Sequence, residues 1–127
     1  MTKSVLIVDD ESYIVTSLSF VMKSAGFEVA SASDGEEALE KVAAMVPDLI
    51  ILDVMMPKLD GFEVCRVIRE NPAWNSVRII MLTAKGRDSE REKGLALGAD
   101  DYLTKPFSTR DILQRAQEIL DQSRAAS

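Results

Sequence analysis

Acidic residues stand at two places where apolar runs of the sequence end abruptly. The stretch at 6–11 reads LIVDDE and the stretch at 49–53 reads LIILD. Carboxylates brought close together repel and raise one another's pKa unless a cation is bound. Hard oxygen ligands, too few for a calcium cage, suit Mg²⁺, which keeps several waters and often bridges to a phosphate. Asp9, Asp10 and Asp53 are therefore expected to form a Mg²⁺ site if the fold brings them together.

A hydroxyl and an ammonium group end two further apolar runs. Thr83 follows IIML at 79–82, and Lys105 closes the run that begins at Asp101. A hydroxyl, a lysine charge, a divalent ion and a carboxylate are the parts that stabilise a phosphoryl group in transfer, where positioning and electrostatics carry most of the catalysis. Each residue alone is more often a helix cap or an exposed side chain. A shared location is what would make them a site.

Short apolar runs alternate with longer segments of helical period, which is typical of βαβ units around a parallel sheet. The expected strands are Val5–Val8, Phe27–Ala32, Leu49–Asp53, Val77–Thr83 and Asp101–Thr104. Apolar stripes at helical spacing predict three helices, one beginning near Ile14, one near Ala38, and one between Ile112 and Leu120. Two further helices, the third and fourth in chain order, are expected at Phe62–Glu70 and Ser89–Leu97. The fourth is the weakest, because its apolar content is low and Gly94 costs about 1 kcal/mol relative to alanine.

Five strands and five helices with right-handed crossovers predict an α/β protein, a flavodoxin-like three-layer sandwich with a five-stranded parallel sheet in the order 2-1-3-4-5. In such sheets ligands bind beyond the carboxyl ends of the strands, where the winding reverses. That point lies between the first and third strands, so Asp9, Asp10 and Asp53 should converge. We expect one domain over residues 1–127.

Several other residues are expected to have structural roles only. Asp34, Asp48 and Asp60 are interpreted as caps or turn residues, with Asp34 capping the second helix, and Asp100 and Asp101 as loop or cap residues before the last strand. Gly98 is expected to end the fourth helix. Cys65 is expected to be a small buried hydrophobe, and Tyr13, Phe20, Phe27, Phe62 and Phe107 to pack in the core or at its rim.

Composition excludes several functions. The net charge of −6 argues against direct nucleic acid binding, which needs a clustered basic surface. The chain has no histidine, so Ser–His and Cys–His catalysis and a phosphohistidine on this chain are excluded. Its apolar runs are too short to cross a bilayer, and acids interrupt any secretory signal, so we expect a cytoplasmic protein without membrane contact.

Four motifs together resemble the receiver domain of two-component response regulators, the CheY-like family. They are LIVDDE at 6–11, LIILDVMMPKLDGFE at 49–63, IIMLTA at 79–84 and GADDYLTKPF at 98–107. The resemblance implies that Asp53 is the phosphoacceptor and that Asp9, Asp10, Asp53 and the Met55 backbone carbonyl bind Mg²⁺. It also implies that Thr83 and Lys105 hold the phosphoryl group, that Tyr102 is the rotating aromatic of the switch, and that the Lys105–Pro106 bond is cis.

The resemblance implies a signalling phosphoacceptor rather than an enzyme. A sensor histidine kinase or a histidine phosphotransfer protein would donate the phosphoryl group in a phosphorelay, and the face made by the fourth helix, fifth strand and fifth helix would then change shape and bind a downstream protein or output domain. Met55 and Lys85 flank the pocket at positions that influence the lifetime of the acyl phosphate. Met55 offers no group to orient water, so slow self-dephosphorylation is expected.

Two alternatives share related folds. A Mg²⁺-dependent phosphohydrolase with an aspartate nucleophile would show an Asp-x-Asp pattern after the first strand, whereas Asp9 and Asp10 are adjacent. A flavin-binding electron carrier would need a phosphate loop rich in Ser, Thr and Gly where this chain carries acids. The sequence leaves open whether the receiver acts alone or belongs to a longer regulator.

Overall fold

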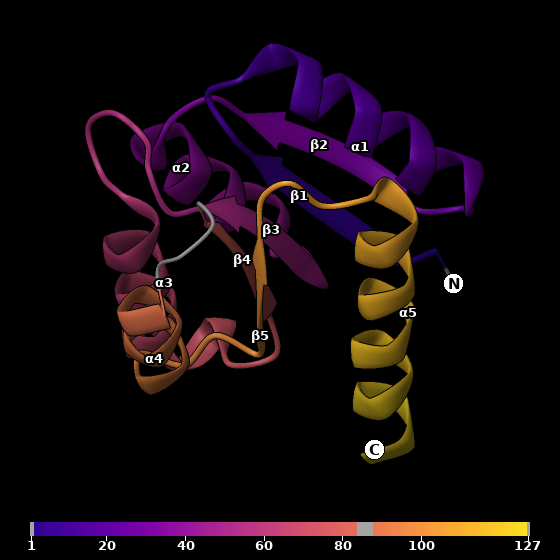
Figure 1. Ribbon diagram of the computed structural model, residues 1–127. Helices are drawn as coiled ribbons and strands as arrows, with labels where there is room; N and C mark the ends of the chain where they lie inside the picture. Colours follow the sequence, from indigo (N-terminus) through magenta and orange to yellow (C-terminus); the bar gives the residue numbers. More distant parts are fainter. Residues whose placement is uncertain (1, 84–87, 127) are drawn as a thin grey trace.

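Strands and helices alternate along the whole chain. The computed structural model describes residues 2–83 and 88–126 (Figure 1). Its elements, in chain order, are β1 Ser4–Val8, α1 Ser12–Ser24, β2 Glu28–Ala32, α2 Gly35–Met45, β3 Leu49–Asp53, α3 Gly61–Glu70, a short 3₁₀ helix Pro72–Trp74, β4 Arg78–Thr83, α4 Asp88–Ala96, β5 Asp101–Thr104 and α5 Thr109–Ala126.

The strands form one parallel sheet in the order β2-β1-β3-β4-β5, which confirms the predicted topology. The register aligns the carboxyl ends of neighbouring strands. Val8 of β1 pairs with Leu52 of β3, and Thr83 of β4 pairs with Thr104 of β5. The residues that end these strands therefore share one edge of the sheet.

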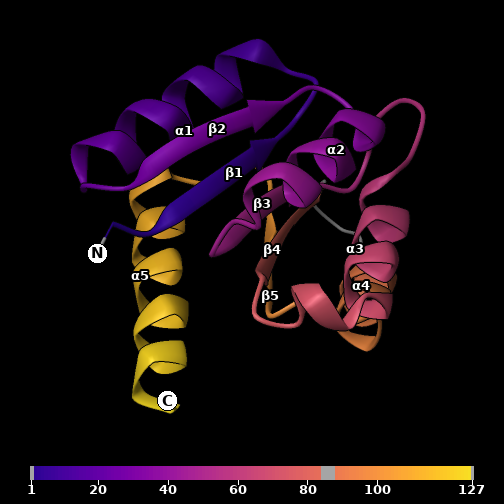
Figure 2. The same ribbon diagram turned by 180° about the vertical axis from the view of Figure 1, so that it is seen from behind.

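Alternate residues of the central strands supply two separate apolar layers, because successive side chains of a strand point to opposite faces. Val5, Ile7, Leu49 and Ile51 pack against α1 and α5. The residues between them belong to the other layer, under α2, α3 and the end of α4: Leu6, Val8, Ile50, Leu52. Figures 1 and 2 show α1 and α5 on one face of the sheet and α2, α3 and α4 on the other. Burial on both faces explains why β1 and β3 are apolar along their length.

Two helices begin with aspartate caps. The Asp34 carboxylate accepts a hydrogen bond from the Glu37 N–H at 2.8 Å, and Asp60 accepts one from the Glu63 N–H at 2.9 Å. Gly98 follows α4 with φ at 109°, a left-handed conformation that favours glycine. These caps and the buried position of Cys65 agree with the sequence.

Some local predictions were wrong. Asp48 does not cap a helix; it accepts the Ser4 N–H at 2.8 Å and so joins the starts of β3 and β1. Tyr13 and Phe20 are 66% and 72% exposed, since the buried stripe of α1 passes through other residues, Ile14, Leu18 and Met22.

Strand starts also differ by one residue from the prediction. β4 starts at Arg78, because the Val77 N–H is bonded to the Trp74 carbonyl in the preceding turn, and β2 starts at Glu28, because the Phe27 N–H is bonded to the end of α1. In the part of the chain that the structure describes, no helix has the length and apolar character needed to cross a membrane.

Candidate functional site

Three carboxylates meet where β1 and β3 end side by side. Asp9 and Asp10 directly follow β1, and Asp53 is the last residue of β3. One oxygen from each lies within 4.8 Å of the others. Asp9 and Asp53 are 2% and 3% exposed, whereas Asp10 faces solvent. The structure therefore brings together the three acids that the sequence predicted to converge.

Loop backbone holds the two buried carboxylates in place. The Glu11 N–H donates to Asp9 Oδ1 at 2.9 Å, and the Met55 N–H donates to Asp53 Oδ1 at 3.3 Å. At Gly61, the first residue of α3, a Cβ atom would lie 2.5 Å from the Asp53 carbonyl oxygen. Only glycine lets the helix approach the end of β3 this closely, which explains the Asp60-Gly61 pair in the sequence.

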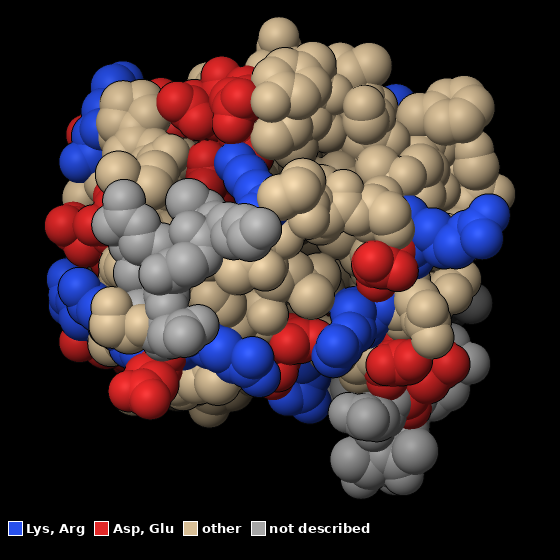
Figure 3. All heavy atoms as spheres, viewed as in Figure 1, with Lys and Arg blue, Asp and Glu red and all other residues tan. Residues whose placement is uncertain are grey.

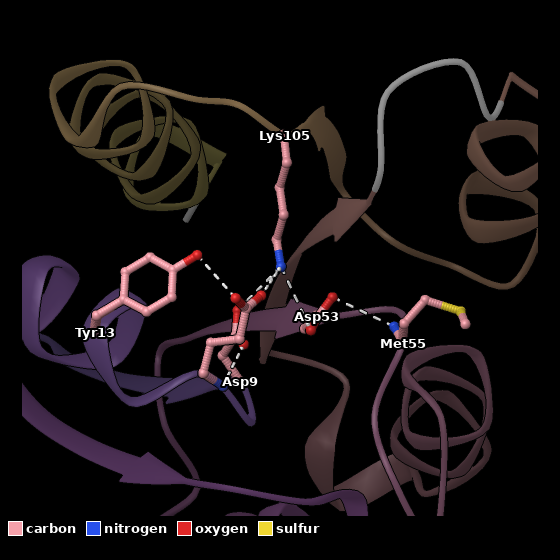
Figure 4. A network of polar contacts seen from close by, with 6 residues as sticks. Asp9, Tyr13, Asp53, Met55 and Lys105 are labelled. Carbon is pink, nitrogen blue, oxygen red and sulfur yellow. Dashed lines mark hydrogen bonds and ion pairs between the residues drawn. The ribbon is translucent and has the colours of Figure 1, made fainter.

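Lys105 reaches into this cluster from the end of β5. Its ammonium nitrogen lies 3.5 Å from Asp9 Oδ2 and 3.6 Å from Asp53 Oδ2 (Figure 4). The backbone N–H of Lys105 donates to the Thr83 carbonyl at 2.6 Å, and this bond holds the Lys105 backbone beside the end of β4. The peptide bond between Lys105 and Pro106 is cis, the isomer expected from the sequence.

The charges of the site perturb one another. Burial, followed by the negative charge of Asp9, raises the pKa of Asp53 to about 6, and the Lys105 charge offsets part of this rise. Burial also raises the pKa of Asp9 above its usual value. For Lys105 burial acts to lower the pKa, but Asp53, Asp9 and Glu11 together outweigh it and raise the pKa. Among the described residues, the site is a buried pair of acids with Lys105 as the neighbouring cation.

Residues 5–117 match the response regulator receiver domain. The chain belongs to this family. Receiver domains are the phosphoacceptors of two-component signalling, and they use a Mg²⁺ site at an acidic cluster of the kind formed by Asp9, Asp10 and Asp53. The family does not favour the phosphohydrolase alternative.

Similar proteins include regulators and isolated receiver domains. The alkaline phosphatase synthesis transcriptional regulatory protein PhoP of Bacillus subtilis is 50% identical over 100% of this chain and 52% of its own length. The phosphate regulon transcriptional regulatory protein PhoB of Rhizobium meliloti is 42% identical over 94% of this chain and 53% of its own. The chain thus spans about half the length of these curated relatives.

A solved CheY-like receiver domain protein from Methanospirillum hungatei has nearly the same backbone. It is 29% identical, with a TM-score of 0.91 over 100% of both chains. The likeness agrees with the flavodoxin-like receiver architecture described above.

The two further residues that the receiver resemblance singled out are both buried. Thr83, at the end of β4, is 1% exposed. Tyr102, in β5, is 5% exposed and packs in the core layer that also contains Met81 and Phe62. The aromatic ring of Tyr102 is thus part of the core in this structure. Lys85, expected to flank the pocket, lies outside the described residues.

Two residues near the receiver site have no signal in the sequence pattern. The Glu11 carboxylate accepts from the Lys105 ammonium at 3.2 Å and from the Tyr13 hydroxyl at 2.8 Å. These two hydrogen bonds, that from Tyr13 first, lower the pKa of Glu11. The sequence indicated only packing in the core or at its rim for Tyr13, and no separate role for Glu11. Only the third-acid position in DDE could have drawn attention to it.

The donor set of the receiver site fits a small hard cation. Carboxylate oxygens are the ligands that Mg²⁺ prefers, and the exposed Asp10 leaves one side of the cluster open to water. Acidic side chains gather in the upper part of the face in Figure 3, with a basic side chain next to them. Elsewhere on that face acidic and basic side chains are interspersed, as expected for a chain of net charge −6.

Proposed function

We propose that Asp53 is the residue of this receiver domain that accepts the phosphoryl group. The observation that carries the proposal is the placement of its buried carboxylate between two groups of opposite kind: the acids Asp9 and Asp10, and the Lys105 ammonium at 3.6 Å. An aspartate carboxylate is a recognised nucleophile that forms an acyl phosphate.

Asp9, Asp10, Asp53 and the backbone carbonyl of Met55 are the groups that would hold Mg²⁺. When bound, the ion would neutralise charge on the acids and on the phosphoryl oxygens. The fixed bonds from the Glu11 and Met55 N–H groups keep the Asp9 and Asp53 carboxylates oriented before any ligand arrives. This arrangement reduces the reorganisation needed at the moment of reaction.

The chain's own residues account for the rest of the transfer. An Asp53 carboxylate oxygen attacks phosphorus, an oxygen–phosphorus bond forms, and the bond from phosphorus to the donor atom breaks with its electron pair leaving on the donor. Lys105 and the Thr83 hydroxyl then face the phosphoryl oxygens. Because the chain has no histidine, the donor is external, and we propose a sensor histidine kinase or a histidine phosphotransfer protein in the cytoplasm.

We further propose that residues 1–127 act as one signalling domain rather than as a turnover enzyme. Phosphorylation would shift Thr83 and Tyr102 and so change the face made by α4, β5 and α5, where a downstream protein or an output domain would bind. A phosphoryl group can bias two existing states only by its difference in interaction energy with each. We assign no direct nucleic acid or membrane contact to this chain.

Labelling with a small phosphodonor tests the assignment of Asp53. The chain is incubated with acetyl phosphate and Mg²⁺ and its intact mass is measured. We expect one added phosphoryl group on the wild type and none on Asp53→Asn, whose amide is not a nucleophile. Undiminished labelling of Asp53→Asn would refute the assignment, and turnover of generic phosphate esters without labelling would indicate a hydrolase.

The acyl phosphate is expected to be long-lived. Met55 is 63% exposed beside the site and offers no group that could orient an attacking water. Decay of the labelled protein can be followed by intact mass after the donor is removed. A half-life of seconds would contradict this expectation, and Met55→Asn, which introduces a polar group there, should shorten it.

A further inference from the structure

Lys105 has a third acidic partner that lies outside the metal cluster. The distance from its ammonium nitrogen to Glu11 Oε1 is 3.2 Å, shorter than the 3.5 Å to Asp9 and the 3.6 Å to Asp53. Three carboxylates therefore share one ammonium group. In Figure 4 the Lys105 side chain points toward Asp9 and Asp53.

The Glu11 side chain contacts Lys105 but does not cap the backbone of its own helix. It occupies the N-cap position of α1, where a side chain normally accepts a hydrogen bond from the first turn, but it makes no such bond. Its second oxygen, Oε2, accepts from the Tyr13 hydroxyl at 2.8 Å. One carboxylate oxygen is thus held by α1 while the other faces Lys105.

The same ammonium group would be required by a phosphoryl group on Asp53. A phosphoryl group adds strong negative charge and new acceptor oxygens, and a lysine supplies only one charge. Glu11 is 42% exposed at the side chain and Lys105 is 24% exposed, so their attraction is screened by water and modest. A modest attraction suits a contact that must be exchanged for another.

We propose that Glu11, oriented by Tyr13, is a positioning residue that competes with the phosphoryl group for Lys105. In the unphosphorylated chain Glu11 holds the ammonium group, and phosphorylation draws it away. Glu11 therefore weakens the affinity of the site for the phosphoryl group and favours the resting state. This inference rests on the proposed function, because it requires Asp53 to be the acceptor.

Beryllofluoride, an anion with the shape of a phosphoryl group, measures this competition at equilibrium. Its affinity is determined by titration at saturating Mg²⁺ for the full chain and its variants. Glu11→Gln should bind about two- to five-fold more tightly, the range expected for loss of a partly exposed ion pair. Tyr13→Phe leaves the net charge unchanged and should shift the affinity in the same direction by less. Glu63→Gln, an exposed acid in the first turn of α3, controls for net charge and should bind as the wild type does.

A shorter acid separates contact from charge. Glu11→Asp keeps the negative charge but lacks the methylene needed to reach Lys105, so it too should bind beryllofluoride more tightly. Wild-type affinity in Glu11→Asp alongside tighter binding in Glu11→Gln would overturn the proposal in favour of a general charge effect. Unchanged or weaker binding in Glu11→Gln would also overturn it.

Thermal unfolding without ligand shows whether Glu11 has only a structural role. A residue that merely supports the loop would lower both the unfolding temperature and the affinity when replaced. The competition predicts that the two quantities separate: the unfolding temperature of Glu11→Gln should not exceed that of the wild type, yet its affinity for beryllofluoride should be higher. If the wild type bound no beryllofluoride, the proposed function itself would fail, whereas binding by the wild type without a change in the variants would refute only the role of Glu11.

Discussion

At the residue scale, the site concentrates negative charge that the fold tolerates at a cost. Asp53 and Asp9 are nearly inaccessible to water. The ammonium group of Lys105 lies close to both, and the third acid of the cluster, Asp10, is exposed. Burial and mutual repulsion raise the pKa of both buried acids. An ionised carboxylate whose pKa is raised by the fold destabilises the folded state in the absence of metal. A bound cation would offset this cost.

The raised pKa of Asp53 predicts how stability changes with pH in metal-free buffer. The folded value is about 6 and the unfolded value is near 4, so the native state binds more protons between these limits. The free energy of unfolding should therefore fall as pH rises from about 4 to about 6 and then level off. Asp53→Asn cannot ionise and should be more stable than the wild type at pH 7, by about 2–3 kcal/mol.

Denaturant unfolding at several pH values measures this difference. Asp9 and Asp10 at the end of β1 and Lys105 at the end of β5 face Asp53, and they remain in the variant. Mg²⁺ should narrow the gap at pH 7, because a ligand that binds only the native wild type stabilises it. A variant less stable than the wild type at pH 7 without metal would contradict the pKa argument.

The residues of the site could be predicted from the sequence to the extent that strand ends determine them. Asp9, Asp53, Thr83 and Lys105 each follow or end an apolar run, and a parallel sheet gathers such ends at one edge. Glu11 could not be predicted in the same way. Its contacts with Lys105 and Tyr13 depend on side-chain directions in a loop, which no periodic pattern encodes.

At the element scale, an ion pair joins α3 to the opposite end of the sheet. The Asp100 carboxylate accepts from the Ile79 N–H at 2.8 Å and from the Arg69 guanidinium at 3.0 Å. Arg69 also donates to the Gly98 carbonyl at 2.9 Å. The sequence indicated only a loop or cap role for Asp100, because both arginine and backbone partners come from distant segments.

Removing this carboxylate should destabilise the domain. Asp100→Ala removes the acceptor of the buried Ile79 N–H and one acceptor of the Arg69 guanidinium, which keeps the Gly98 carbonyl, at a cost of about 1–3 kcal/mol. Asp100→Asn keeps an amide oxygen for the Ile79 N–H and should lose less. The free energy of unfolding in urea distinguishes the two variants. Equal losses of unfolding free energy in the two variants would show that the bond from the Ile79 N–H contributes little to the effect.

Helix α4 is held more loosely than α1. Among the residues whose side chains are described in α4, only Gly94 is buried, whereas α1 buries Ile14, Leu18 and Met22. Few buried apolar contacts mean a low free energy of local opening. The thin apolar content of this segment had indicated the same, although the helix begins at Asp88 rather than Ser89.

Amide hydrogen exchange tests this difference between the helices. We expect amides in the middle of α4 to exchange faster than those in the middle of α1 under native conditions. A small free energy of opening would also keep α4 responsive to changes at Thr83 and Tyr102. Exchange in α4 as slow as in α1 would count against a mobile role for this helix in the proposed switch.

At the scale of the whole molecule, one parallel sheet links the acidic site to the α4–β5–α5 face. β4 ends at Thr83, whose carbonyl accepts from the Lys105 N–H. The neighbouring strand β5 contains Tyr102 and ends one residue before Lys105. Asp101, the first residue of β5, forms an ion pair with Arg115 of α5 at 3.0 Å. The proposed change at the site would therefore reach that face through directly adjacent strands.

The layered architecture could be predicted from the sequence, because alternating βα segments and continuous apolar strands leave few other arrangements. The burial of the Tyr102 ring could not be predicted in this way. The ring packs close to Met81 and Gly94, where a Cβ on Gly94 would lie 2.8 Å from the Met81 sulfur and 3.4 Å from the Tyr102 ring. Such contacts follow from the assembled core rather than from any local pattern.

Direct location of the phosphoryl group tests the central claim. The chain labelled with acetyl phosphate and Mg²⁺ is reduced with borohydride, which converts an aspartyl phosphate to homoserine, and the product is digested and sequenced by mass spectrometry. We predict homoserine at position 53 and nowhere else. Homoserine at position 9 or 10, or a labelled chain without homoserine at 53, would contradict the assignment of Asp53 as the phosphoacceptor.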